Sequence, residues 1–199
     1  MEAALRHLRA VDPALIPWID QIGPFALQTQ PHGFATLVYA IISQQISLTA
    51  ARAIRDRLAA ALGDITPTAI LAAGDTTLRA AGLSTQKIAS LYDLAARVSD
   101  GRLNLAQLAS LDDETAIAHL TAARGIGRWT AEIYLIFGLG RLDILPATDL
   151  GLRDAIRLVD ELPKIPSPSE LLARGERWRP YRSVACWYLW QIRRIITQR

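Results

Sequence analysis

The chain contains few of the residues that build disulfides and metal centres. Its one cysteine, Cys186, excludes an intrachain disulfide framework and an iron–sulfur cluster held by four cysteines of this chain. Its three histidines are scattered, which makes a zinc site a poor interpretation. Lysine is also scarce: Lys87 and Lys164 are the only two among 22 basic residues. The arginine excess suits phosphate ligands, but a net charge of +3 alone does not identify a nucleic-acid binder.

Long apolar runs are absent as well. The longest candidate, 34–42, is shorter than the roughly 18 residues that a membrane-spanning helix needs. The first residues include Glu2, Arg6 and His7 and lack the shape of a signal peptide, so we expect a cytoplasmic protein with no membrane partner. The 199 residues suffice for one sizeable domain or for two small lobes that share a core.

Helical periodicity extends over most of the chain. Apolar residues recur at three- and four-residue spacings, and no alternating strand pattern stands out. The sequence therefore predicts an all-α fold with short connections between helices, which are interrupted at glycines and prolines. The predicted helices cover residues 13–21, 33–45, 48–62, 67–73, 76–81, 84–99, 104–109, 113–123, 128–139, 149–160, 168–175 and 181–197.

The most informative segment is a glycine turn between the helices predicted at 113–123 and 128–139. Gly125 and Gly127 enclose Ile126, as in a tight hairpin with a buried aliphatic side chain. The first amides of the second helix would point outward at the positive end of its dipole, where phosphate binds. An ordinary corner with a glycine cap would also explain the two glycines. The candidate backbone-binding residues are Arg124, Gly125, Ile126, Gly127, Arg128 and Thr130.

A second segment delivers an aspartate to the start of a helix. A stretch rich in glycine, with one proline, runs over 138–148 and ends at Asp149, directly before the helix predicted at 149–160. Taken alone, Asp149 is most simply an N-cap. Together with the glycine turn, which matches the helix-hairpin-helix motif, it resembles the HhH-GPD superfamily of base-excision DNA glycosylases.

Within that superfamily the chain resembles the 3-methyladenine DNA glycosylase II (AlkA-like) group, over about residues 30–195. The resemblance lies in 41–47, 125–131, 146–149 and 178–190. It implies a compact form without the N-terminal β domain of larger bacterial members. It also implies a single catalytic unit in 1–199, with one helical lobe at about 34–145 and a second from 1–33 plus 146–199.

The resemblance implies a chemistry centred on Asp149. Breaking an N-glycosidic bond builds positive charge on the sugar, which a carboxylate stabilises. The family often has a second acid one residue earlier, where this chain has Thr148, so catalysis is assigned to Asp149 alone. Bifunctional relatives carry a lysine nucleophile at the position of Trp129, so the resemblance implies a monofunctional enzyme. Such an enzyme extrudes a cationic alkylated purine and hydrolyses its bond to the sugar.

Aromatic residues are the candidates for the base pocket. The resemblance places Trp129 and Trp190 there, with Tyr134 and Tyr39 as weaker candidates. Trp129 also belongs to an apolar helical stripe, a pattern that is more often core. Trp178 and Trp187 are interpreted as packing residues, and Cys186 as a buried thiol. Arg182, Arg193 and Arg194 suit phosphate contacts and helix solubility equally well.

The loop between the helices predicted at 33–45 and 48–62 resembles the family's minor-groove loop. Its residues Gln44, Gln45, Ile46 and Ser47 are candidates for DNA contact. The side chain that fills the gap left by a flipped base is often apolar in the family. This chain has Gln45 at that position, with Ile46 as the alternative, and Ser47 is the candidate cap of the following helix.

The partner that the resemblance implies is double-stranded DNA with alkylated bases, bound by a monomer that associates with the nucleoid. No cofactor and no metal are assigned, and a monovalent cation at the hairpin carbonyls is left open. Two alternatives also stay open: a non-catalytic helix-hairpin-helix DNA-binding module, and a glycosylase for oxidised or mismatched bases. The sequence does not rank 3-methyladenine, 7-methylguanine, 1-methyladenine and hypoxanthine.

Overall fold

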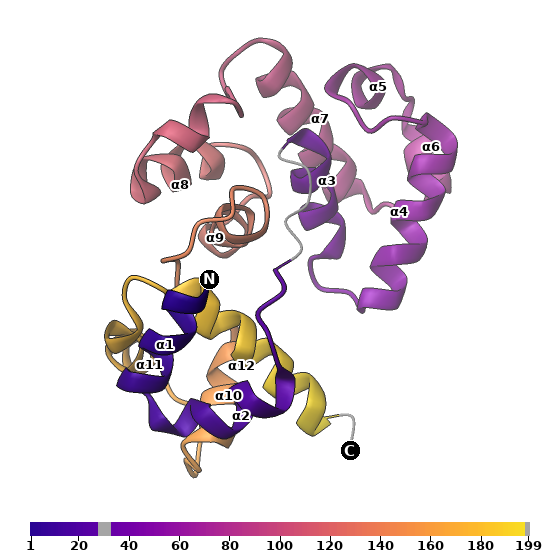
Figure 1. Ribbon diagram of the computed structural model, residues 1–199. Helices are drawn as coiled ribbons and strands as arrows, with labels where there is room; N and C mark the ends of the chain where they lie inside the picture. The colour runs from indigo at the N-terminus through magenta and orange to yellow at the C-terminus, as the bar shows by residue number, and fades with distance from the viewer. Residues whose placement is uncertain (28–32, 198–199) are drawn as a thin grey trace. The chain divides into compact units, whose positions relative to one another are not determined.

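The computed structural model describes residues 1–27 and 33–197 of the chain (Figure 1). The described part contains α-helices, short 3₁₀ turns and no strand, which confirms the predicted all-α class. None of its helices has the length and apolar character needed to cross a bilayer. The helices are α1 (Glu2–Val11), α2 (Ile16–Ile22), α3 (Phe34–Ser43), α4 (Leu48–Leu62), α5 (Pro67–Ala72), α6 (Asp75–Ala80), α7 (Thr85–Ser99), α8 (Asp113–Thr121), α9 (Arg128–Phe137), α10 (Leu150–Val159), α11 (Pro168–Gly175) and α12 (Arg182–Thr197).

Side-chain caps explain where many of these helices begin. A hydroxyl or carboxylate at the N-cap accepts a hydrogen bond from a backbone amide of the first turn, which has no partner inside the helix. At α11 the cap is reciprocal, because the Glu170 carboxylate also accepts from the Ser167 amide. The capping residues are Ser47, Thr66, Ser84, Asp112, Asp149 and Ser167.

Two helix predictions were wrong. Helix α1 was missed, although its apolar face buries Ala4 and Leu8 in the core. The helix predicted over 104–109 is only a 3₁₀ turn at Gln107–Ser110. There the Asn104 side chain accepts hydrogen bonds from the amides of Ala106 and Gln107, and this local turn competes with a regular helix.

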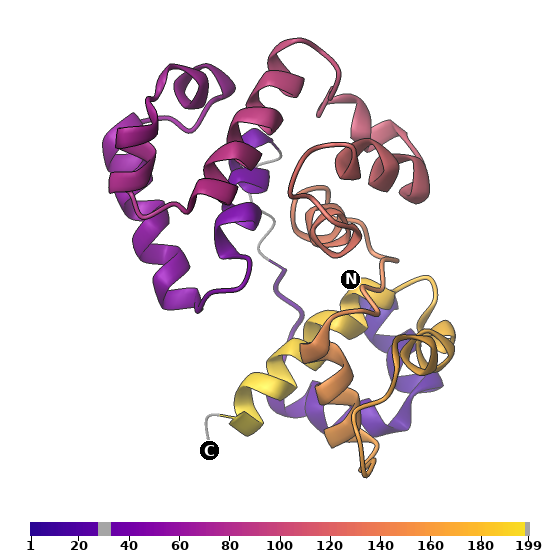
Figure 2. The same ribbon diagram turned by 180° about the vertical axis from the view of Figure 1, so that it is seen from behind.

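The chain folds as two compact units, Met1–Gln28 with Gly140–Arg199 (unit 1) and Thr29–Leu139 (unit 2). In unit 2, α3 packs against α4, α7 and α9, and α8 packs against α9. In unit 1, α10 and α12 lie side by side, as both views show (Figures 1 and 2), and α2 also packs on α12. Helix α3 is thus in contact with three other helices of unit 2, and α12 with α2 and α10 in unit 1.

The core of unit 1 confirms the packing roles expected for three residues. Trp178 is fully buried and Cys186 is a buried free thiol. Trp187 is partly buried against the same core and makes edge contacts with the rings of Phe25 and Tyr188.

A buried charge network joins the start of unit 1 to its end. Asp12 is 1% exposed and accepts a hydrogen bond of 2.6 Å from the Trp178 indole. Arg174 forms a bidentate pair with Asp12 and a second pair with Asp160. The guanidinium thus pairs with two carboxylates at once, and one of them is inaccessible to water.

We expect Asp12→Ala to lower the free energy of unfolding by about 3–5 kcal/mol, because it removes one of the two carboxylates that pair with a largely buried guanidinium and leaves the Trp178 indole without its acceptor. Urea denaturation measures the change. Asp20→Ala, which removes an exposed pair with Arg9, is the matched control and should change stability little. Equal effects of the two substitutions would contradict the assigned role of Asp12.

Candidate functional site

The glycine turn predicted at 125–127 connects α8 to α9 in a tight hairpin. Gly125 has a φ of +79°, and a Cβ built on it would lie 2.4 Å from the Ser90 hydroxyl oxygen. Ile126 is 4% exposed, so its side chain anchors the turn in the core of unit 2. The hairpin therefore needs glycine at 125 for both its backbone conformation and its close approach to α7.

The start of α9 is open to solvent. Its N-cap is Gly127, which supplies no side-chain cap, and both Gly127 and Arg128 are exposed. The first amides of a helix carry the positive end of its dipole. This end of α9 is thus suited to a phosphate group, as the sequence predicts.

Asp93 of α7 holds the other side of the hairpin, a contact that sequence reasoning missed. Its carboxylate accepts from the Arg124 amide at 2.7 Å and from Arg97 at 2.8 Å. Burial acts to raise the pKa of Asp93, but these two interactions outweigh it and the pKa lies below the usual range. Beside them is a cavity of about 480 Å³ lined by α7, Gln44 and 121–127. The aspartate stays ionised and fixes the turn.

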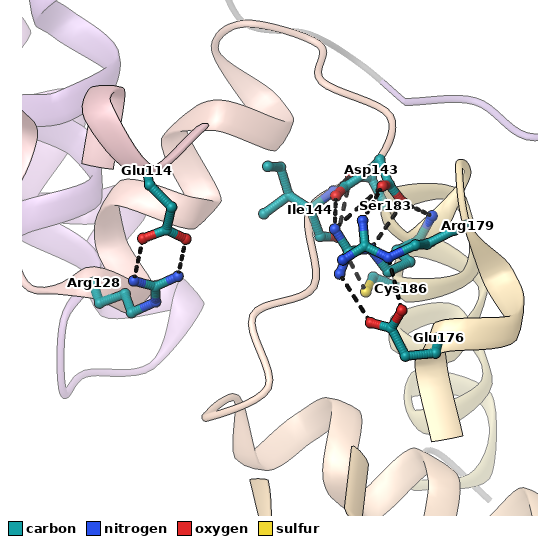
Figure 3. Close-up of polar contacts among 9 residues, drawn as sticks. Glu114, Arg128, Asp143, Ile144, Glu176, Arg179, Ser183 and Cys186 are labelled. Carbon is teal, nitrogen blue, oxygen red and sulfur yellow. Dashed lines mark hydrogen bonds and ion pairs between the residues drawn. The ribbon is translucent and has the colours of Figure 1, made fainter. Parts of the chain in front are cut away.

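The two arginines that flank the hairpin have different environments. Arg128 pairs bidentately with Glu114 of α8 (Figure 3) and also with Glu132, whose pKa burial raises. Arg128 thus joins α8 to α9, and its role as a phosphate ligand stays a prediction. Arg124 is exposed and forms an ion pair with no residue that the structure describes. The available cation at the hairpin is Arg124.

The candidate minor-groove loop is bound to the hairpin. The side-chain amide of Gln44 donates to the Gly125 carbonyl at 2.9 Å and to the Thr130 hydroxyl at 3.1 Å. Gln45 is exposed with a φ of +59°, and Ile46 is 37% exposed. The loop thus presents two adjacent side chains to solvent while its first residue faces inward.

The next helix begins at this loop as expected. The Ser47 hydroxyl accepts from the Ala50 amide at 3.2 Å, which confirms its role as the cap of α4. The Gly125 carbonyl is already an acceptor for Gln44, and a monovalent cation at the hairpin carbonyls stays a prediction.

Asp149 lies at the N-terminus of α10 in unit 1. One carboxylate oxygen, Oδ1, accepts from the Leu152 amide at 2.8 Å and from the Trp190 indole at 3.3 Å. The aspartate is therefore both a helix cap and a carboxylate oriented by an aromatic side chain. A Cβ on Gly151 would lie 3.0 Å from Oδ1, so the glycine leaves room for the carboxylate.

The segment leading to Asp149 is fastened to the start of α12. Asp143 pairs with Arg179 and Arg182, and Ser183 bonds to both the amide and the carbonyl of Ile144 (Figure 3). Arg182, with 11% of its side chain exposed, is thus structural. Because α12 also carries Trp190, this one helix positions both the segment that leads to Asp149 and the indole that bonds to its carboxylate. Sequence reasoning did not find Asp143 or Ser183.

The four aromatic candidates differ in accessibility. Trp129 is 37% exposed on the first turn of α9, and Trp190 is half-buried beside Asp149. Tyr134 is 1% exposed in the core of unit 2, and burial raises the pKa of its hydroxyl. The prediction that Tyr134 contacts a base is therefore wrong for this structure, because the ring is covered.

Tyr39 is a poor stacking surface. The guanidinium of Arg55 lies 4.0 Å from the centroid of its ring, so one face of the ring is occupied. This cation–π contact also gives Arg55 a partner within unit 2. No group of three or more histidine, cysteine, aspartate or glutamate side chains suited to a metal ion occurs in the described part of the chain.

A comparison with protein families decides the affiliation. The model described as "HhH-GPD superfamily base excision DNA repair protein" matches residues 38–180, which include the loop, the hairpin and Asp149. The chain belongs to the HhH-GPD superfamily. The resemblance inferred from the sequence is therefore confirmed, and with it the predicted architecture.

Individual HhH-GPD proteins resemble the chain over nearly its whole length. DNA-3-methyladenine glycosylase 1 of Schizosaccharomyces pombe is 34% identical over 95% of this chain and 86% of its own length. A solved structure of the S. pombe 3-methyladenine DNA glycosylase with abasic DNA has a TM-score of 0.88, 33% identity and 96% coverage of both chains. A DNA-3-methyladenine glycosidase from Bacillus halodurans has a TM-score of 0.86 and 34% identity, covering 98% of this chain and 91% of that one.

The contrast between the hairpin arginines gives a test of the interface. Arg124→Ala should weaken binding of duplex DNA and reduce the slope of log K against log salt by about 1, with unfolding unchanged. Arg128→Ala should instead lower the free energy of unfolding by about 1–2 kcal/mol, since it leaves Glu132 buried without its partner. Salt titrations of DNA binding and urea denaturation check both results. An unchanged salt slope in Arg124→Ala would show that this cation does not contact phosphate.

The space at Gly151 gives a second test. Gly151→Ala should displace the Asp149 carboxylate by a few tenths of an ångström and slow base excision on the order of tenfold, because catalytic groups tolerate little misplacement. Single-turnover kinetics at saturating enzyme measure the rate. Gly74→Ala is the matched control, because nothing lies within 4 Å of a Cβ there. A normal rate in Gly151→Ala would mean that the carboxylate position is not critical.

Proposed function

We propose that the chain is a monomeric, monofunctional DNA glycosylase that removes alkylated purines of the 3-methyladenine and 7-methylguanine class from duplex DNA. The observation that carries the proposal is the placement of Asp149, whose carboxylate is held by a helix amide and by an indole. The family match and the named activities of the similar proteins support the reaction class.

The chemistry follows from what a fixed carboxylate does beside a sugar. As the N-glycosidic bond breaks, positive charge develops near C1′ of the deoxyribose. The negative charge of Asp149 stabilises it, and the carboxylate is positioned to orient the water that attacks C1′. Because both hydrogen bonds reach the same oxygen, the orientation of the carboxylate is set before substrate binds.

The absence of a lysine nucleophile supports simple hydrolysis. Trp129 stands where a lyase of this family would carry lysine. Lys87 donates its ammonium hydrogen bonds to the carbonyls of Ile42 and Gln44, and Lys164 lies in the segment before α11 in unit 1. Trp129 at the lyase position and the engagement of Lys87 both argue against a Schiff base, and the expected product is an abasic site on an intact strand.

Alkylated purines suit a site that contains one carboxylate and an indole ring. A purine methylated at N3 or N7 is cationic and leaves without strong acid catalysis. It also stacks favourably on an indole, by about 1–2 kcal/mol when water is excluded. The half-buried ring of Trp190, already hydrogen-bonded to Asp149, is the favoured stacking surface.

Asp149→Asn tests the assignment with little change in shape, since asparagine also caps helices. We expect base excision to fall at least about 100-fold while binding to the same duplex is retained. The assay follows release of 3-methyladenine and 7-methylguanine from methylated DNA, with binding measured by fluorescence anisotropy. Equal excision by both proteins would refute catalysis by Asp149.

A lesion panel tests the substrate class and the two alternatives. The wild type should release methylated purines and should form no borohydride-trapped complex with DNA. Release of 8-oxoguanine without methylated purines would favour a glycosylase for oxidised bases. Binding without release of any base would leave the non-catalytic module as the better description.

A further inference from the structure

Lys87 occupies an unusual place for a lysine. It lies in the first turn of α7, and its side chain is partly buried instead of extending into solvent. Its ammonium nitrogen donates to the Ile42 carbonyl at 2.5 Å and to the Gln44 carbonyl at 3.0 Å. Burial lowers the pKa of this ammonium group.

Both acceptors belong to the end of α3. The last carbonyls of a helix have no partners inside it and carry the negative end of the dipole, so a cation there is favourable. Gln44 is the C-cap of α3 and has left the helical conformation, with a ψ of 131°. Lys87 therefore binds one carbonyl inside the helix and one just beyond it, across the point where the chain turns into the loop.

The same loop residue is bound a second time. The Gln44 side chain donates to the Gly125 carbonyl and to Thr130 in the hairpin. Lys87 thus holds the backbone of Gln44, and the hairpin holds its side chain. The loop cannot move away from the hairpin without breaking one of these two sets of contacts.

The backbone of Gln45, which follows Gln44, shows why the loop needs these contacts. Gln45 has a φ of +59°, a conformation that costs a non-glycine residue about 1–2 kcal/mol. The residue is exposed, so neighbouring side chains do not enforce this backbone. The fixed carbonyl of Gln44 directly before it and the Ser47 cap of α4 shortly after it confine the turn.

We propose that Lys87 is a positioning residue that keeps Gln45 and Ile46 directed at the duplex, so that one of them fills the gap left by an extruded base. The inference rests on the proposed function, because it assigns a task within base extrusion. It adds a residue of α7, outside the loop and the hairpin, to the apparatus that separates base pairs.

This role predicts a substrate-dependent defect. A base in duplex DNA must be unpaired and replaced in the stack, whereas a base in a single strand needs neither. Loss of Lys87 should therefore impair action on duplex DNA and spare action on the single strand. Damage to Asp149 or to the fold would impair both.

The experiment uses Lys87→Met, which keeps an unbranched side chain and removes the donor. In single-turnover assays at saturating enzyme, excision of a methylated purine should fall on the order of tenfold in duplex DNA and less than about twofold in the unpaired strand. Lys164→Met, the other lysine of the chain, is the matched control and should match the wild type on both. Lys87→Gln keeps a side-chain donor, so its loss of excision in duplex DNA should be smaller than that of Lys87→Met, again with the single strand spared. This variant replaces Lys87→Met in the assay if the methionine variant does not fold.

Fluorescence of 2-aminopurine beside the lesion separates this inference from the proposed function, because it reports unstacking whether or not a base is released. Wild-type protein should raise the fluorescence of the duplex and Lys87→Met should not. If the wild type unstacks DNA but releases no base, the proposed function fails and the inference stands. Equal losses of excision from both substrates, or equal fluorescence with both proteins, would overturn the inference.

Discussion

Every helix leaves its first amides and last carbonyls without partners inside the helix. The candidate functional regions of this protein lie at helix ends, where these groups find partners in different ways. At the end of α3 the partner is Lys87. At the start of α10 it is Asp149. At the start of α9 the N-cap residue is Gly127, which supplies no side-chain cap. The loop, the proposed catalytic carboxylate and the proposed phosphate site thus all lie at helix ends, where the need for such partners arises.

The arginines show that charge composition is a poor guide to charge function. Arg128 and Arg182 lie in segments whose sequences suggest DNA contact. Each forms ion pairs with carboxylates that join one part of the chain to another. Arg174 likewise serves two aspartates inside unit 1. Arg124, which forms an ion pair with no described residue, remains available for a polyanionic partner.

The sequence predicted most of what depends on neighbouring residues. Helix class, the glycine hairpin, the Ser47 cap and the place of Asp149 before α10 all follow from local patterns. It did not predict contacts between distant segments. Asp93 and Lys87 act on the hairpin and the loop from α7, and nothing in their own neighbourhoods marks them out. The prediction that Tyr134 contacts a base was wrong for the same reason, because helical spacing does not show which side of α9 is covered by another helix.

The double use of Asp149 has a consequence for how this site can change over time. Catalytic residues commonly weaken the proteins that carry them, so that stability and activity are traded against each other. Under the proposed function, the oxygen of Asp149 that accepts from Trp190 also caps α10, so one residue serves both the reaction and the fold. Most replacements would therefore lose the reaction and loosen the helix together. Selection for a stable protein alone would then help to preserve the proposed catalytic group.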